Sequence, residues 1–354
     1  MDDHLLCFPL LSHRPGIRRA CTGCSPAILA HRGRLSMVRI GVISNAHSKR
    51  NKISMREIHH LLAEHPHVKH RSFNHISELP NCLAEMAAAG ITHLAVSGGD
   101  GTVLAVVSAL LNNSPFATPP CLSLLSAGMT NVIAHEVGQP GLPANGLKRL
   151  VMRVEAGEPG EVLERPVLSV DFGDGRAIER GFLIGGIGFY QGTQLVRRDI
   201  HSLGAKQIFA AKLGIAWSII KILVFGPGRR SGFHGETIGL TVDGVSEQRD
   251  CFIFLGSTLN SVLPGVAPFW GEGPGRLQLT TIDSPPRRLA SAALSVLRGK
   301  PKSWMHSAGY VSRRIEKLEL DIRSPVMIDG ECFQPPASGR IVVTAGPVMQ
   351  FHRF

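Results

Sequence analysis

The chain has 354 residues, enough for two domains with hydrophobic cores, and its apolar and charged fractions, 44% and 18%, are those of a globular protein. Its formal net charge of +11 suggests an anionic partner: nucleic acid, an anionic membrane surface or anionic small substrates. A solvated basic surface is an equally good interpretation. Nucleic acid is disfavoured, because aromatic residues are few and no zinc-finger spacing or long basic run occurs.

Cysteine usage indicates the compartment. Of the seven cysteines, only Cys21 and Cys24 form a C-x-x-C pair, and no second pair or matching histidines complete a zinc motif. Reduced thiols in a cytosolic protein are therefore the simplest expectation. Several histidines crowd between residues 59 and 70, but Pro66 interrupts the helix there and scatters them, so surface histidines are favoured over a metal site.

The first 36 residues differ from the rest of the chain. They show no clear hydrophobic periodicity, and the stretch 20–30 is too polar for a secretory signal. Met37 stands directly before Val38–Ser44, which has the pattern of a first strand. We therefore expect residues 1–36 to be a disordered extension, or to precede the true start at Met37.

Residues 37–157 alternate short apolar strands with amphipathic helices. The expected strands are Val38–Ser44, Val68–Phe73, His93–Ser97 and Cys121–Leu125, and the expected helices are Ser54–Glu64, Ile76–Ala89, Thr102–Asn112 and Asn145–Ala156. Such alternation predicts a parallel, helix-covered sheet, in which ligands bind at the carboxyl ends of the strands. Two glycine-containing turns, Gly98–Thr102 and Ser126–Asn131, follow such ends and are expected to face one cleft.

Beyond the linker Gly157–Gly160, residues 161–354 are expected to form a second, mostly antiparallel β-sandwich domain. The expected strands are Arg165–Phe172, Arg176–Ile184, Gly235–Val242, Val245–Leu255, Arg276–Ile282, Lys317–Ile322, Pro325–Ile328 and Arg340–Ala345. A helical insertion is expected at 194–225. Its apolar part, Ile208–Phe225, carries Lys212 and Lys221, which suits either a lipid-facing surface or an ordinary packing helix.

The turn Gly98–Thr102 is the strongest functional signal. Its three glycines let the backbone approach a bulky group, and the helix N-terminus that follows suits phosphate. Asp100 would repel phosphate unless it acts through a cation or a hydroxyl. The turn therefore predicts a nucleotide-phosphate site with a metal ion, and a plain strand–helix turn is the alternative. No P-loop motif and no complete G-x-G-x-x-G occur elsewhere.

Ser97–Thr102 resembles the G-G-D-G-T signature that diacylglycerol kinase-like lipid kinases, sphingosine kinases and NAD kinases share. Three further segments resemble the lipid-kinase branch: Ile43–Asn45, Gly128–Asn131 and Ile328–Glu331. The resemblance runs in order from Val38 to about Thr344. The NAD-kinase branch would show an asparagine–glutamate pair where this chain has Asn131 and Val132.

The resemblance implies a role for each matching residue. The turn residues would bind the ATP phosphates through backbone N–H groups, and Asp100 would act through Mg²⁺. Glu331 would be the general base that takes the proton from the lipid hydroxyl. The residues implied in nucleotide binding are Asn45, Gly98, Gly99, Gly101, Thr102, Thr130 and Asn131.

The chain also departs from the family at two places. Val132 replaces the aspartate of the usual G-T-x-N-D, and Pro274–Gln278 lacks the carboxylates of D-G-x-L-D. Together with this resemblance, the residues imply an ATP- and Mg²⁺-dependent lipid kinase, which we expect to be cytoplasmic and peripheral at the inner face of the membrane. NAD phosphorylation and a non-catalytic nucleotide or lipid sensor are the alternatives. The lipid and the oligomeric state stay open.

Overall fold

The computed structural model describes residues 38–353 apart from 49–50, 128–131, 139–140, 159 and 201–231. Residues 38–354 form one compact unit. The expectations for residues 1–36, for Thr130 and Asn131, and for residues 201–225 of the helical insertion lie outside the described residues. No helix in the described part of the chain is both long and apolar enough to cross a bilayer.

The first half is a parallel sheet flanked by helices, as expected. Its elements are β1 (Ile40–Asn45), α2 (Asn51–Glu64), β2 (Lys69–Phe73), η1 (Ile76–Glu78), α3 (Leu79–Ala88), β3 (His93–Gly98), α4 (Asp100–Asn112), β4 (Cys121–Ser126), α5 (Val132–Val137) and α6 (Pro143–Glu155). The strands pair in parallel in the order β4-β3-β1-β2. Alternate residues of β3 enter different cores: Leu94 and Val96 pack in one, and Ala95 packs in the other with residues of α2 and α6.

The second half is largely antiparallel, also as expected. Its strands are β5 (Glu161–Asp171), β6 (Glu179–Gly181), β7 (Leu183–Ile187), β8 (Glu236–Val242), β9 (Val245–Ser257), β10 (Leu277–Asp283), β11 (Tyr310–Ile315), β12 (Lys317–Asp321), β13 (Val326–Ile328), β14 (Glu331–Phe333) and β15 (Arg340–Arg353). β8 and β9 form a hairpin whose two turn residues, Asp243 and Gly244, have φ angles of 48° and 89°. These positive angles are those of a two-residue turn that matches strand twist.

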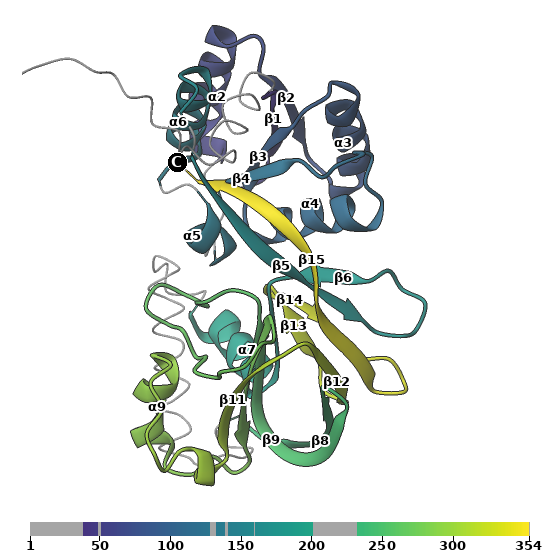
Figure 1. Ribbon diagram of the computed structural model, residues 1–354, viewed down its shortest axis with the longest axis vertical. Coiled ribbons are helices and arrows are strands. Elements are labelled where there is room, and N and C mark those ends of the chain that lie inside the picture. Colours follow the sequence, from purple (N-terminus) through teal and green to yellow (C-terminus); the bar gives the residue numbers. More distant parts are fainter. Residues whose placement is uncertain are drawn as a thin grey trace, which may run out of the picture. The chain divides into compact units, whose positions relative to one another are not determined.

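The described strands of both halves are connected by hydrogen bonds into one continuous sheet. The path runs β14-β13-β7-β9-β8-β12-β15-β4-β3-β1-β2, and it passes between the halves through β15, drawn in yellow in Figure 1. β15 pairs antiparallel with β12 and parallel with β4, where Phe351 faces Leu122. In the second half, residues of β5, β8, β10, β12 and β13 share one core, so the sheet there folds over itself.

Among the element boundaries that differ from expectation, those of β15 and α7 differ most. β15 continues to Arg353, not to Ala345, because the register shifts between Ala345 and Val348 and the strand resumes beyond this bulge. The helix expected from Gln194 begins at Gly188 as α7 (Gly188–Ile200). Gly188 looks like a turn glycine in sequence, but a Cβ there would lie 2.8 Å from the Phe252 carbonyl oxygen, so close packing on β9 requires it. α9 (Leu289–Leu297) and η3 (His306–Ala308) complete the described helices.

Candidate active site

The glycine-rich turn joins β3 to α4. Gly98 ends the strand, Gly99 is the extended N-cap residue, and Asp100 is the first residue of the helix. A Cβ on Gly98 would lie 2.4 Å from the Thr102 side chain, so only glycine lets the buried threonine pack against the strand end. The N–H groups at a helix N-terminus carry partial positive charge, and in α4 the N–H of Thr102 already bonds to the Gly99 carbonyl, so the donors that could face a phosphate come before Thr102. The turn therefore offers backbone donors of the kind that bind phosphate.

Asn45, at the end of β1, contacts this turn directly. Its Nδ2 donates a hydrogen bond to Thr102 Oγ1 at 2.9 Å, and its Oδ1 accepts one from the His47 N–H at 2.9 Å. The residue predicted to line the nucleotide site is thus attached to the turn through Thr102. Parallel pairing of β1 and β3 places both strand ends at the same edge.

A buried asparagine that the sequence analysis did not single out fixes these two strand ends. Asn51 opens α2, is fully buried, and its Nδ2 donates to the Asn45 carbonyl at 2.8 Å and to the Ser97 carbonyl at 2.9 Å. The Ser97 hydroxyl donates back to Asn51 Oδ1 at 2.7 Å. Asn51 therefore sets the spacing of the two strands on which Asn45 and the glycine turn depend.

Asp100 links the turn to the next helix. Its Oδ1 accepts a hydrogen bond at 3.3 Å from the N–H of Ile133, in the first turn of α5. A carboxylate at a helix N-terminus is favoured by the helix dipole. Val132, which stands where the family has an aspartate, is the first residue of α5. Thr130 and Asn131 lie just before it, outside the described residues.

Glu331 comes from the second half of the chain and reaches the same turn. Its Oε1 lies 3.7 Å from the position that a Cβ on Gly101 would occupy. Glu331 is exposed and is the first residue of β14, which pairs with β13 through Ile328. Two residues more than 200 positions apart thus meet at one place: the turn predicted to bind phosphate and the predicted general base.

Asp329 holds the Glu331 turn in position. Its backbone has a φ of 46°, its N–H donates to the Leu183 carbonyl, and its carboxylate accepts the N–H groups of Phe182 and Leu183, each at 2.9 Å. Part of the residue reaches solvent, but the carboxyl group itself is buried. Burial first, and the nearby Asp100 carboxylate second, raise the pKa of Asp329 to about 7. In the sequence, Asp329 stands out only as part of the segment Ile328–Glu331.

The Pro274–Gln278 segment has no carboxylate and serves the core. Gln278 is buried on β10, and its Nε2 donates to the Leu259 carbonyl at 2.7 Å. Gln278, which stands where the resembling kinases have an aspartate, therefore provides the hydrogen bond that this loop carbonyl needs.

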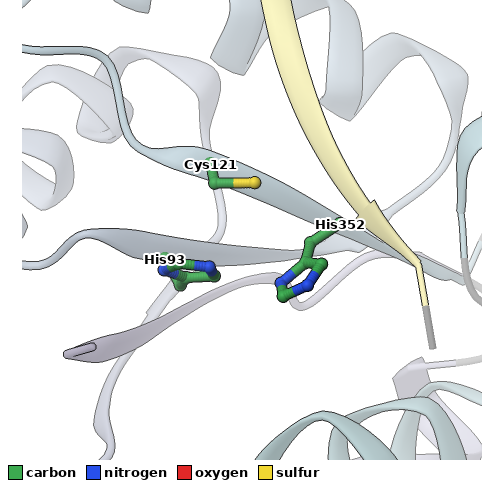
Figure 2. A group of neighbouring side chains, drawn as sticks. All are labelled: His93, Cys121 and His352. Carbon is green, nitrogen blue, oxygen red and sulfur yellow. The ribbon is translucent and has the colours of Figure 1, made fainter. Parts of the chain in front are cut away.

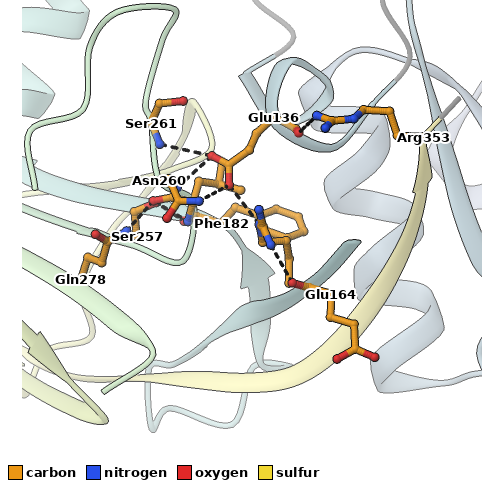
Figure 3. A network of polar contacts seen from close by, with 10 residues as sticks. Glu136, Glu164, Phe182, Ser257, Asn260, Ser261, Gln278 and Arg353 are labelled. Atoms are coloured by element: carbon orange, nitrogen blue, oxygen red, sulfur yellow. Dashed lines mark hydrogen bonds and ion pairs between the residues drawn. The ribbon is translucent and has the colours of Figure 1, made fainter. Parts of the chain in front are cut away.

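Glu136 on α5 is a second contact between the halves, and the sequence did not indicate it. Its side chain is only 10% exposed, and it forms an ion pair with Arg165 of β5 at 3.0 Å. It also accepts the N–H groups of Asn260 and Ser261, at 2.8 and 3.2 Å (Figure 3). The helix that Asp100 caps is thereby held against the loop after β9.

Comparison with known proteins identifies relatives of both the sequence and the fold. Residues 39–158 match the family model of the diacylglycerol kinase catalytic domain. A probable lipid kinase YegS-like protein of Pseudomonas fluorescens is 30% identical over 166 residues, which cover 45% of this chain. The match spans 48% of that relative, about half of its length.

Solved structures extend the likeness across the fold. A diacylglycerol kinase and a putative diacylglycerol kinase, both from Bacillus anthracis str. Sterne, align with TM-scores of 0.58 and 0.60 at 14% and 15% identity. Each alignment covers 89% of this chain and 97% of the solved chain. At this identity the likeness establishes the fold, including the parallel first half and the largely antiparallel second half.

Proposed function

We propose that this chain, whose residues 39–158 match the family model of the diacylglycerol kinase catalytic domain, is an ATP- and Mg²⁺-dependent lipid kinase. The γ-phosphate of ATP would pass to a hydroxyl of a diacylglycerol- or sphingoid-like lipid. The observation that carries the proposal is the approach of Glu331 to Gly101, because phosphoryl transfer needs a base beside the bound phosphates.

In this proposal each residue performs a role that its position supports. The first-turn N–H groups of α4, including that of Gly101, bind the phosphates of ATP. Asn45, fixed through Thr102, borders the nucleotide on the β1 side. Thr130 and Asn131 are proposed as nucleotide-binding residues from their match to the family motif alone. Glu331 accepts the proton of the lipid hydroxyl while the hydroxyl oxygen attacks the γ-phosphorus. The bond between that phosphorus and the oxygen that leaves with ADP breaks.

The residues present fit a magnesium ion. Asp100, at the start of α4, supplies carboxylate oxygens, the donor type that Mg²⁺ prefers. When bound, the ion would neutralise phosphate charge that would otherwise repel Asp100. Asp100 would hold it while remaining anchored to α5 through the Ile133 N–H.

Incubation with labelled ATP separates this proposal from its two alternatives. The full chain is given a total-lipid extract or NAD in parallel, and the products are resolved by thin-layer chromatography. Label in a lipid supports the proposal, and label in NAD alone supports NAD phosphorylation. ATP binding without turnover on either acceptor supports a nucleotide sensor.

Two variants test the assigned base. Glu331→Gln should lower the turnover number by about 10²–10⁴-fold with little change in ATP affinity, because general-base catalysis contributes about that much. Glu316→Gln, in the connection between β11 and β12, is the matched control and should keep the wild-type rate. Full activity in Glu331→Gln would remove Glu331 from the mechanism.

We also propose peripheral membrane contact through α9. Its sequence is almost entirely apolar, yet only Ala292 and Val296 are buried, and Leu294 is 57% exposed. Exposed basic residues flank the helix: Arg287, Arg288, Arg298, Lys300 and Lys302. An exposed apolar surface bordered by cations suits an anionic bilayer, where each nearby cation contributes about 1 kcal/mol.

Vesicle sedimentation tests this contact. Leu294→Asp should weaken binding to vesicles that contain anionic lipid, because it places a charge at the centre of the apolar surface. Val245→Asp is the control, since Val245 is 73% exposed but lies at the β8–β9 turn. Equal binding by the two variants would argue against α9 as the contact.

A further inference from the structure

Three potential metal ligands converge at the end of the first-half sheet opposite the glycine turn. His93 is the first residue of β3, Cys121 is the first residue of β4, and His352 lies near the end of β15. Their ligand atoms, one from each side chain, all lie within 4.8 Å of one another (Figure 2). Cys121 lies 28 positions after His93, and His352 lies 231 positions after Cys121, so no spacing motif connects the three residues.

Strand register explains the convergence. His93 and Cys121 are direct partners in the β3–β4 pairing. Phe351 pairs with Leu122, so His352 falls beside Ser123, and residues 121 and 123 of β4 project from the same face of the sheet. β3 and β15 flank β4 and are therefore about 10 Å apart. The two imidazole rings nevertheless approach to a centroid distance of 5.1 Å by leaning over β4.

The chemistry of the three side chains is that of a transition-metal site. His352 is 4% exposed, and His93 and Cys121 are half-buried. A neutral imidazole offers a lone pair from one ring nitrogen, and a cysteine binds a metal through its thiolate sulfur. An ion that binds there must displace the thiol proton to solvent as the sulfur–metal bond forms, which favours thiophilic ions over Mg²⁺ or Ca²⁺.

We propose that His93, Cys121 and His352 form a binding site for a thiophilic divalent metal ion, for which Zn²⁺ is the best fit. Zinc takes imidazole nitrogens at about 2.0–2.1 Å and thiolate sulfur at about 2.3 Å in a tetrahedron. These three ligands leave one position for water, and His93 and Cys121 are partly exposed to solvent.

The position of the site indicates a structural role. β3 runs from His93 to Gly98, about 17 Å at the usual rise per residue, so the metal site and the glycine turn lie at opposite ends of one strand. The site joins β15, the strand shared by the two halves, to β4 and β3. A bound ion would therefore fasten the last strand to the first-half sheet and would not take part in phosphoryl transfer.

Metal binding to the full-length, reduced chain tests the proposal, with Co²⁺ as the spectroscopic probe and Zn²⁺ as the competitor. Wild type should show a thiolate-to-cobalt charge-transfer band that Zn²⁺ abolishes. Cys121→Ser and His352→Gln should each lose the band and at least about tenfold in Zn²⁺ affinity, since even outer-shell changes cost that much. Zn²⁺ should raise the melting temperature of wild type, but not that of Cys121→Ser.

Two control variants exclude other ligands. His67→Gln disrupts the more exposed group of His65, His67 and Glu155, and Cys21→Ser/Cys24→Ser removes the C-x-x-C pair. Both should keep the charge-transfer band. Absence of the band in wild type, or its loss in Cys21→Ser/Cys24→Ser, would overturn the proposal.

Alkylation of the wild-type chain gives a measurement that does not depend on folded variants. Zn²⁺ should slow alkylation of Cys121, measured by peptide mass spectrometry, and leave the exposed Cys332 unchanged. An equal rate at Cys121 with and without Zn²⁺ would also overturn the proposal.

Discussion

Asp329 combines a structural role with an unusual ionisation. Its carboxyl accepts two backbone N–H groups, which stabilise the charged form, but burial and the Asp100 carboxylate oppose them and raise its pKa to about 7. In the unfolded chain the same group ionises near pH 3.8. Between these two values the folded state binds more protons than the unfolded state, so the free energy of unfolding falls as pH rises.

We therefore predict a pH-dependent difference between wild type and Asp329→Asn. The stabilisation from protonated Asp329 is complete below about pH 4, is lost as pH rises to about 7, and changes little above that. The slope for one group is at most about 1.4 kcal/mol per pH unit. Urea unfolding from pH 5 to 8 should show this slope in wild type and in the exposed control Asp171→Asn, but not in Asp329→Asn. Parallel curves for all three proteins would contradict the prediction.

Two glycines of the same turn should respond to alanine in opposite ways. A Cβ on Gly98 would overlap the Thr102 side chain, so Gly98→Ala should cost about 1–3 kcal/mol of stability. A Cβ on Gly101 meets only Glu331 Oε1, at an ordinary 3.7 Å, and alanine is favoured in a helix by up to about 1 kcal/mol. Gly101→Ala should thus fold at least as stably as wild type, while the added methyl obstructs the bound phosphates.

Thermal melting and the rate of label transfer from ATP separate the two effects. Gly98→Ala should have a lower melting temperature than wild type. Gly101→Ala should transfer label more slowly, with an unchanged or higher melting temperature. A fully active Gly101→Ala would mean that the phosphates do not approach this residue.

At the scale of elements, α5 depends on Glu136 for its position. Removing this side chain leaves the Arg165 guanidinium without its carboxylate and the N–H groups of Asn260 and Ser261 without their acceptor. Because the pair is mostly buried, we predict that Glu136→Ala costs about 2–4 kcal/mol. Glu155→Ala on α6 is the control, since Glu155 is 40% exposed and should cost less than about 1 kcal/mol.

Urea unfolding followed by circular dichroism measures both variants. Glu136→Gln adds a useful intermediate, because an amide oxygen still accepts N–H groups but cannot neutralise Arg165. The free energy of unfolding of Glu136→Gln should therefore lie between that of wild type and that of Glu136→Ala. Equal stability of Glu136→Ala and Glu155→Ala would show that α5 is held by other contacts.

Local patterns predicted most of the elements and part of the candidate site. The alternation that predicted β1 to β4 and the Asp243–Gly244 hairpin depends on periods and turns within a few residues. The glycine turn and Asn45 could be predicted for the same reason, because their motifs lie within a few residues. Asn51, Glu136 and Asp329 were not, because they also bind Ser97, Asn260 and Phe182, which lie 46, 124 and 147 positions away, and no local signal specifies such pairs.

Other elements were missed because their sequences are ambiguous. β14 has only three residues, and β11 carries two adjacent arginines in place of an apolar stretch. The second part of β15 follows Gly346 and Pro347, which usually end a strand. That one omission concealed His352, and with it the proposed metal site.

For the whole molecule, β15 makes the two halves depend on each other. Its beginning pairs with β12 in the second-half core, whereas Met349 and Phe351 near its end are buried in the first-half core. Phe351 also contacts Phe182, from the junction of β6 and β7, at a centroid distance of 5.9 Å. One strand therefore belongs to both cores, and unfolding either half removes packing from the other.

We accordingly predict that residues 38–354 unfold in one cooperative transition despite their two-part architecture. Phe351→Ala should lower that transition by about 3–5 kcal/mol, the usual cost of removing a buried phenylalanine. Val348→Ala, on the same strand but 44% exposed, should cost about 0.5 kcal/mol or less. Differential scanning calorimetry distinguishes one cooperative transition from independent unfolding of the halves. Two heat-absorption peaks, of which Phe351→Ala displaces only one, would show that β15 does not couple the halves.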